Sequence, residues 1–372
     1  MTAREKIMKN TMDKIRELCP DSVIGRYSEI GKDVDIQKIT TGSLAVDIAL
    51  GGGFPKSKIT DIVGKTSSGK TTLALTACAE MQKENPDANI LYIDAEIALD
   101  PSYAAALGVN MDKIHLCQPD CGESGFTAAE VFIASGVADL VVIDSIAAMV
   151  PKAVLDLDVG ETVQIGSYAR LIGRGLSKIN AIASKNKCTV ILINQWKPAV
   201  RANMYSAVGG LGGSMYQPGG EALPFLCSQI IEVARISTIK DTKGNIVSSV
   251  TRMTCKKNKV APPYRSAEFV ITYGKGLDKV QEIIGLGLTT GLIKKAGSFF
   301  SIPGHHDGNF HGRAKLAEFL EENMDIVEKL EKTLRETLIN AKTIVLEKDD
   351  NAEDDEEGLK SVNEVSESQI VE

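Results

Sequence analysis

Residues 64–71 read Gly-Lys-Thr-Ser-Ser-Gly-Lys-Thr, and this stretch constrains the fold more than any other part of the chain. A β-prone segment at 59–63 comes before it, and an apolar helical segment follows from Lys70. Strand, glycine turn and helix together fit the pattern G-x-x-x-x-G-K-[ST]. Glycines let successive N–H groups point into one anion-sized nest, and the helix N-terminus adds partial positive charge there. The stretch therefore predicts a phosphate-binding loop whose ligand is a nucleoside triphosphate.

Side chains in and near this loop suit triphosphate chemistry. Lys70 can reach the β- and γ-phosphates, and the Thr71 hydroxyl can bind Mg²⁺. Asp144 ends the apolar segment 140–143, where a second residue for Mg²⁺ is expected. The predicted nucleotide contacts in the loop are Gly64, Lys65, Thr66, Ser67, Ser68, Gly69, Lys70, Thr71 and Thr72.

The composition is typical of a soluble protein with more than one domain. The chain has 372 residues, of which 43% are hydrophobic and 24% charged. We expect no membrane span and no signal peptide, because the sequence lacks apolar runs of the required kind. Seven scattered cysteines indicate reduced thiols and a cytoplasmic location. His115, Cys117 and Cys121 are close in sequence, but their spacing matches no standard zinc motif.

The net charge of −7 is concentrated at the C-terminus. From Glu347 onward there are eleven acidic residues and two lysines, so this segment carries −9 and the remainder about +2. Bulk charge therefore gives no argument against nucleic-acid binding, and local basic loops must decide it.

The pattern of apolar segments predicts an α/β fold. Buried strands are expected at 89–94, 140–144 and 189–194, with helical segments between them. This alternation is typical of a mostly parallel central sheet covered on both faces. Further strands, expected to extend the sheet in antiparallel fashion, are 230–234, 252–255 and 268–272.

The predicted parts of the chain are an N-terminal helix and linker at 1–34, a P-loop ATPase core at 35–276, a small α-rich C-terminal α/β domain at 277–341, and an acidic disordered tail at 342–372. Residues 3–18 carry an apolar stripe at helical spacing. That stripe must be buried either on its own chain or on a neighbouring copy, and the sequence leaves both open.

Glu96 follows closely after the strand at 89–94, at the sheet edge where α/β proteins bind ligands. A carboxylate there can polarise the water that attacks a γ-phosphate. The alternative is a purely structural acid at a strand end.

Two loops have unusual composition for a compact domain. Residues 156–166 contain few turn formers, and residues 196–220 are rich in glycine. The second loop contains the only tryptophan, Trp196, close to Lys197 and Arg201. Basic and aromatic residues on such a loop suit single-stranded nucleic acid, although Trp196 can equally pack at the base of the loop.

Lys257 and Lys259 flank Asn258 at the end of a predicted strand and therefore face the same way. A solvated charged surface is one interpretation. Contact with a phosphate across a subunit boundary is the other.

Taken together, the motifs of residues 22–340 resemble the bacterial RecA recombinase family, including its phage-encoded members. The resemblance is carried by Thr41-Gly42-Ser43-Leu44, Ser67-Ser68-Gly69-Lys70-Thr71-Thr72, Ile93-Asp94-Ala95-Glu96, Gln118-Pro119-Asp120, Val142-Ile143-Asp144-Ser145, Ile193-Asn194-Gln195, Lys257-Asn258-Lys259 and Lys295-Ala296-Gly297. It implies a RecA-like P-loop core and an ATP- and Mg²⁺-dependent enzyme. Such an enzyme forms helical filaments on single-stranded DNA and catalyses homologous pairing and strand exchange in recombination, DNA repair and the SOS response to DNA damage.

The resemblance also implies roles for individual residues. Glu96 would activate water, and Gln195 would sense the γ-phosphate and signal to the glycine-rich loop. Asp100 and Tyr103 match positions that contact adenine. Lys257 and Lys259 match lysines that reach the ATP of the adjacent protomer.

DNA binding is implied for the two loops and their surroundings. The positions concerned are Ile165, Arg170, Trp196, Lys197, Val200, Arg201, Gly219 and Gly220. Implied partners are single- and double-stranded DNA, further copies of the chain, and loading or mediator proteins. The N-terminal helix would dock on the next subunit, and the acidic tail would restrain access to DNA.

Several positions depart from the family pattern. Lys65-Thr66 stands where Pro-Glu is common, Ile97 where histidine is common, and Pro224 where a lysine is common at the subunit boundary. These departures bear on cooperative coupling and on any repressor-cleavage role, and leave the phosphate chemistry intact. Two alternative functions are a ring-forming DNA helicase and a DNA-coating scaffold with vestigial hydrolysis.

Overall fold

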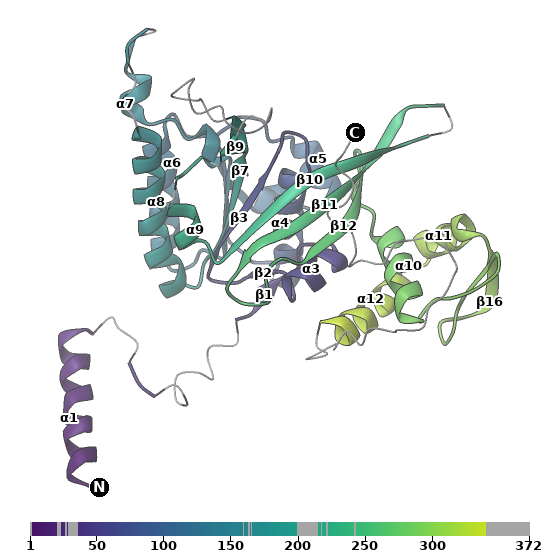
Figure 1. Cartoon of the computed structure of the whole chain (residues 1–372), viewed down its shortest axis with the longest axis horizontal. Helices are drawn as coiled ribbons and strands as arrows, with labels where there is room; N and C mark the ends of the chain where they lie inside the picture. The colour runs from purple at the N-terminus through teal and green to yellow at the C-terminus, as the bar shows by residue number, and fades with distance from the viewer. Residues whose placement is uncertain are drawn as a thin grey trace, which may run out of the picture. The chain divides into compact units, whose positions relative to one another are not determined.

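The computed structural model describes residues 2–339 except 21–23, 27, 29–35, 159, 163, 165, 199–214, 217, 221 and 242. The chain forms two compact units, Met1–Gln37 and Lys38–Glu372. In the first unit, helix α1 (Figure 1) spans Ala3–Leu18. It begins with a capping box between Thr2 and Glu5. The predicted tail at 342–372 lies outside the described residues.

The helices of the second unit are α3 (Leu44–Leu50), α4 (Lys70–Glu84), α5 (Pro101–Ala106), α6 (Gly122–Ala134), α7 (Lys152–Leu155), α8 (Ser167–Lys185), α9 (Ala222–Leu226), α10 (Lys279–Thr290), α11 (Arg313–Glu322) and α12 (Met324–Leu338). Its strands are β1 (Lys38–Ile39), β2 (Phe54–Pro55), β3 (Ile59–Gly64), β4 (Ile90–Asp94), β5 (Ile114–Cys117), β6 (Leu140–Asp144), β7 (Thr189–Gln195), β8 (Lys197–Pro198), β9 (Met215–Tyr216), β10 (Gln229–Lys240), β11 (Ile246–Asn258), β12 (Ser266–Thr272), β13 (Gly276–Leu277), β14 (Lys294–Ala296), β15 (Phe299–Ile302) and β16 (His306–His311). Within the described ranges, no helix has the length and apolar character needed to cross a membrane.

The largest sheet has the strand order β13-β12-β11-β10-β3-β7-β6-β4-β5. The strands from β10 to β5 run parallel, and β11 and β12 continue the sheet in antiparallel fashion. The antiparallel prediction was wrong for 230–234, because β10 pairs in parallel with β3. After α9 the chain passes the start of β3, where the Ser228 N–H donates to the Ile59 carbonyl oxygen. Strands β10 and β3 therefore begin at the same edge of the sheet.

Apolar residues alternate along the parallel strands and form a core on each face of the sheet. On one face, Ile62 belongs to a cluster with residues of α3 and α4. On the other, Ile59 and Val63 belong to a cluster with residues of α6 and α8, two helices that stand side by side in Figure 1. This alternation over a sheet covered on both faces confirms the predicted α/β class.

The segment from α10 onward packs around a third apolar cluster, which includes Leu44 of α3. It contains the antiparallel sheet β14-β15-β16, whose middle strand carries Phe299 and Phe300. Two polar contacts connect it to α3 and the turn before it. Arg335 Nη1 donates to the buried Asp47 Oδ2 at 2.7 Å, and Ser43 Oγ donates to Glu282 Oε1 at 2.5 Å.

Candidate functional site

The phosphate-binding loop has the geometry that its sequence predicts. β3 ends at Gly64 and α4 begins at Lys70, directly after Gly69 in the left-handed conformation with φ 93°. A Cβ atom on Gly64 would lie 2.2 Å from the Val233 carbonyl oxygen, so only glycine fits there. Lys65, Thr66 and Ser67 are exposed at the turn.

Two polar groups of this loop fit a phosphate ligand. Lys70 Nζ donates to the Lys65 carbonyl oxygen at 2.8 Å, which folds the side chain over the loop. The buried Ser68 hydroxyl has no hydrogen-bond partner among the described residues. Burial lowers the pKa of the Lys70 ammonium, while the Asp144 and Glu96 carboxylates oppose that shift. The Lys70 ammonium and the Ser68 hydroxyl can therefore both donate to phosphate oxygens.

Thr71 and Asp144 form the pair expected of a Mg²⁺ site. Thr71 Oγ1 donates to Asp144 Oδ2 at 2.8 Å, and the Tyr92 hydroxyl donates to the same oxygen at 2.8 Å. Burial raises the pKa of Asp144, while these two hydrogen bonds lower it. Within the described residues there is no group of three or more His, Cys, Asp or Glu that could hold a metal ion by itself. One carboxylate and one hydroxyl suit Mg²⁺, which completes its shell with water and substrate phosphates.

Glu96 lies among the carboxyl ends of β4, β6 and β7. Ser145 Oγ donates to its Oε1 at 2.5 Å, and Gln195 Nε2 donates to the same oxygen at 2.6 Å. The turn that carries Glu96 is held by Asp94, whose carboxylate accepts the backbone N–H groups of Ala98 and Leu99. Two predicted catalytic residues, Glu96 and Gln195, are thus in direct contact.

The two predicted adenine contacts lie at the start of α5. Asp100 caps this helix by accepting the N–H groups of Ser102 and Tyr103. The Tyr103 hydroxyl shares a hydrogen bond of 2.8 Å with Thr72 Oγ1, in the first turn of α4. The aromatic ring is therefore fixed beside the phosphate-binding helix.

The glycine-rich loop begins and ends next to Gln195. Asn194 Nδ2 donates to the Pro218 carbonyl oxygen at 3.1 Å, which holds Gly219 and Gly220 close to the end of β7. Lys197 Nζ donates to the Ala147 carbonyl oxygen at 3.2 Å and lies over the Tyr168 ring. Of the other predicted DNA contacts, Arg170 is exposed on α8, and Ile165, Val200 and Arg201 lie outside the described residues.

Trp196 is half-buried and packs against the apolar cluster that involves α6 and α8. Its Nε1 is buried and has no hydrogen-bond partner among the residues that the structure describes. This position favours the interpretation that Trp196 packs at the base of the loop.

Lys257 and Lys259 lie far from the phosphate-binding loop of their own chain. Lys257 pairs with Ile230, which pairs with Asp61, and the Lys259 N–H donates to the Ser228 carbonyl oxygen. Both lysines are therefore at the end of the sheet where β3 begins, whereas the loop follows the other end.

The ammonium groups of these lysines contact α9. Lys257 Nζ donates to the Pro224 carbonyl oxygen, and Lys259 Nζ donates to that of Phe225 at 3.1 Å. Burial and the neighbouring Lys259 lower the pKa of Lys257. Phe225 itself is 73% exposed.

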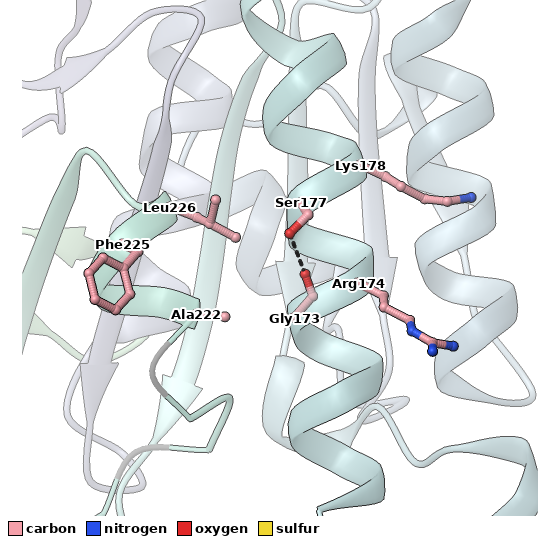
Figure 2. A pocket seen from close by; sticks show the side chains of 7 residues that line it. All are labelled: Gly173, Arg174, Ser177, Lys178, Ala222, Phe225 and Leu226. Atoms are coloured by element: carbon pink, nitrogen blue, oxygen red, sulfur yellow. Dashed lines mark hydrogen bonds between the residues drawn. The ribbon is translucent and has the colours of Figure 1, made fainter.

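An open hollow of about 590 Å³ lies between α9 and α8. Figure 2 shows Ala222, Phe225 and Leu226 on α9 beside α8, where Ser177 donates a hydrogen bond to the Gly173 carbonyl oxygen. The lining is mostly apolar and shares no residue with the Glu96 site.

Sequence reasoning assigned no role to Ser145 or Tyr92. Each lies at the carboxyl-end edge of the sheet or on a strand leading to it, and each donates to a predicted site carboxylate. The available signal was a polar residue directly after Asp144 and a tyrosine inside an otherwise apolar strand.

Comparisons with known proteins agree with this geometry. Residues 6–278 match the family described as RecA N-terminal domain, and residues 281–339 match RecA C-terminal domain. A protein named Protein RecA from Rickettsia bellii is 40% identical over 333 residues, covering 89% of this chain and 93% of that protein. The protein of the same name from Caulobacter vibrioides is 40% identical over 335 residues, 90% of each chain. The protein of that name from Staphylococcus epidermidis is 41% identical over 339 residues, covering 88% of this chain and 93% of that protein.

Proposed function

The chain belongs to the RecA family, and we propose from this premise how its sheet edge hydrolyses ATP for work on DNA. As a family member it is a DNA recombinase and a DNA-dependent ATPase. The observation that best supports our assignment is the convergence of Thr71, Asp144, Glu96 and Gln195 at the carboxyl ends of neighbouring strands. ATP and Mg²⁺ are the proposed substrate and cofactor.

In the proposed reaction, the loop N–H groups and Ser68 hold the phosphates, and Lys70 turns from the Lys65 carbonyl to a phosphate oxygen. Thr71 and Asp144 would hold Mg²⁺, which when bound supplies positive charge to the β- and γ-phosphates. Glu96 accepts a proton from water as the water oxygen attacks the γ-phosphorus. The bond to the bridging oxygen breaks, and ADP and phosphate are the products.

Lys257 and Lys259 are proposed to act on the ATP of the adjacent protomer. Lys259 is level with the start of β3 and Lys257 with Asp61, so at least three residue steps along β3, about 10 Å at the usual rise per residue, separate either lysine from Gly64. A lysine side chain does not cover that distance. A site that includes these lysines therefore needs two copies of the chain.

Exposed apolar side chains, described separately in each of the two units, support assembly into a filament. Phe225 is exposed beside the hollow in Figure 2, and the α9 carbonyls contact the lysine ammonium groups. Helix α1 has no buried residue, and Ile7, Met8 and Leu18 expose apolar side chains there. An apolar stripe of this kind suits a neighbouring copy.

Coupling to DNA is proposed to pass from Gln195 to the glycine-rich loop. Gln195 contacts Glu96, and the adjacent Asn194 holds Pro218 at the end of that loop. Movement of Gln195 toward a γ-phosphate would break its contact with Glu96 and displace the loop. The proposed DNA-contacting residues are Arg170, Lys197, Arg201, Gly219 and Gly220, together with Ile165 and Val200. Trp196 is proposed to support the loop from its base.

Electron microscopy of the full chain with single-stranded DNA tests this proposal, with and without a non-hydrolysable ATP analogue. We expect helical filaments that require the nucleotide, and ATP hydrolysis that DNA stimulates. Closed hexameric rings would instead favour a helicase. Nucleotide-independent coating without hydrolysis would favour a scaffold.

A further inference from the structure

Ser145 occupies a fully buried position between two parts of the proposed site. It follows Asp144 directly at the end of β6 and is 0% exposed. Its hydroxyl donates to Glu96 Oε1 at 2.5 Å. Asp144, the proposed Mg²⁺ ligand, and Ser145, which contacts the proposed general base Glu96, are therefore adjacent residues.

Glu96 itself lies on an exposed turn with an unusual backbone. Ile97, the next residue, has φ 53°, a backbone conformation that β-branched residues rarely adopt. Its side chain is 71% exposed. The turn thus does not pack Glu96 against the core. Its carboxylate is oriented by hydrogen bonds from Ser145 and Gln195 to a single oxygen.

The two donors to Glu96 differ in whether they keep their hydrogen bond during the proposed cycle. Gln195 is proposed to leave Glu96 when it contacts a γ-phosphate. Ser145, in contrast, is fully buried directly after the last residue of β6. After that movement Ser145 is the remaining donor to Oε1 among the described residues. Oε2 accepts no hydrogen bond in the described part of the chain and is left for the attacking water.

We propose that Ser145 is a positioning residue for ATP hydrolysis, which fixes Glu96 through Oε1 so that Oε2 faces the water. This inference rests on the proposed function, because it takes Glu96 as the general base. Ser145 touches neither ATP nor the reacting atoms in this role. Its loss should slow turnover without weakening nucleotide binding.

The test compares Ser145→Ala with the wild-type chain under DNA-stimulated conditions. We expect kcat to fall between about 10- and 100-fold, as for a misplaced catalytic group. KM for ATP and the affinity for a non-hydrolysable analogue should stay within about twofold. Ser248→Ala is the control, since it removes a buried hydroxyl that bonds to Thr272 on β12, away from the site.

A double-mutant cycle separates this role from a general structural one. In a Glu96→Gln background, Ser145→Ala should change the residual rate less than about twofold, because the group it positions is already gone. An equal loss in both backgrounds would overturn the proposal, as would unchanged kcat in the single variant. Full hydrolysis by Glu96→Gln alone would instead remove the proposed general base, and so identifies failure of the underlying function.

Discussion

Gln195 donates a hydrogen bond of 2.6 Å to Glu96, although the two residues lie 99 positions apart in the chain. The contact joins the ends of β7 and β4, which are separated by β6 in the sheet. It places a group suited to sensing phosphate against a group suited to activating water. In the proposed cycle the two residues therefore release each other only when a γ-phosphate competes for the glutamine.

Glu96→Gln should bind ATP and retain DNA filaments while it loses turnover. The amide keeps the shape of the carboxylate but cannot accept a proton from water, so we expect kcat to fall by about 10² to 10⁴. Phosphate release measures turnover, and electron microscopy measures filaments. Full hydrolysis would remove Glu96 from its proposed role.

Lys70→Ala should abolish nucleotide binding. Its ammonium is the cation folded over the loop by the Lys65 carbonyl, and alanine leaves phosphate charge without that partner. Titration with a fluorescent ATP analogue and Mg²⁺ should give no saturable signal. Lys83→Ala is the matched control, because Lys83 is an exposed lysine in the last turn of the same helix, where it pairs with Glu80. Equal binding by both variants would contradict the assignment.

Lys259→Ala should lose hydrolysis when alone and regain part of it when mixed with Glu96→Gln. In a mixed filament, some interfaces pair an intact Glu96 from one variant with an intact lysine from the other. With random equal mixing, about a quarter of the interfaces are complete. ATPase assays of the mixture at constant total protein measure this recovery. If the lysines acted within their own chain, the mixture would show no activity beyond that of its components.

The sequence predicted the local parts of the site well, because they are set by short-range patterns. Gly64, Gly69 and Lys70 form the loop as expected, and Asp144 ends its strand beside Thr71. Contacts across the sheet were harder, since they depend on strand order. The donation from Ser145 to Glu96 needs β6 to lie next to β4, a neighbour relation that no local pattern states.

The direction of β10 was likewise not predictable from local sequence patterns. Its apolar residues predicted a strand correctly, but parallel pairing follows from the path of the chain through α9 to the start of β3. That path also places Lys257 and Lys259 at the opposite end of the sheet from the loop. Spacing alone left two interpretations of these lysines open. Their position means that they do not reach the phosphates of their own chain, and contact across a subunit boundary stays a prediction.

Glu282→Gln should flatten the pH dependence of stability between about pH 5 and 7. Glu282 is buried and accepts hydrogen bonds from Ser43 Oγ and the N–H groups of Leu44 and Ala45, which connect α10 to α3. Burial raises its pKa from 4.5 to about 7, an effect that these hydrogen bonds reduce and the nearby Asp47 increases.

The sign of this effect follows from proton counting. Between these two pKa values, Glu282 keeps its proton in the folded chain and has lost it in the unfolded chain. Its contribution to stability is therefore present below the unfolded pKa and is lost as pH rises through the folded value, by at most about 1.4 kcal/mol per pH unit. Urea midpoints at pH 5, 6, 7 and 8 should fall more steeply for the wild-type chain than for Glu282→Gln. Glu328→Gln, which changes an exposed acid on α12, should keep the wild-type slope; parallel slopes for all three proteins would contradict the prediction.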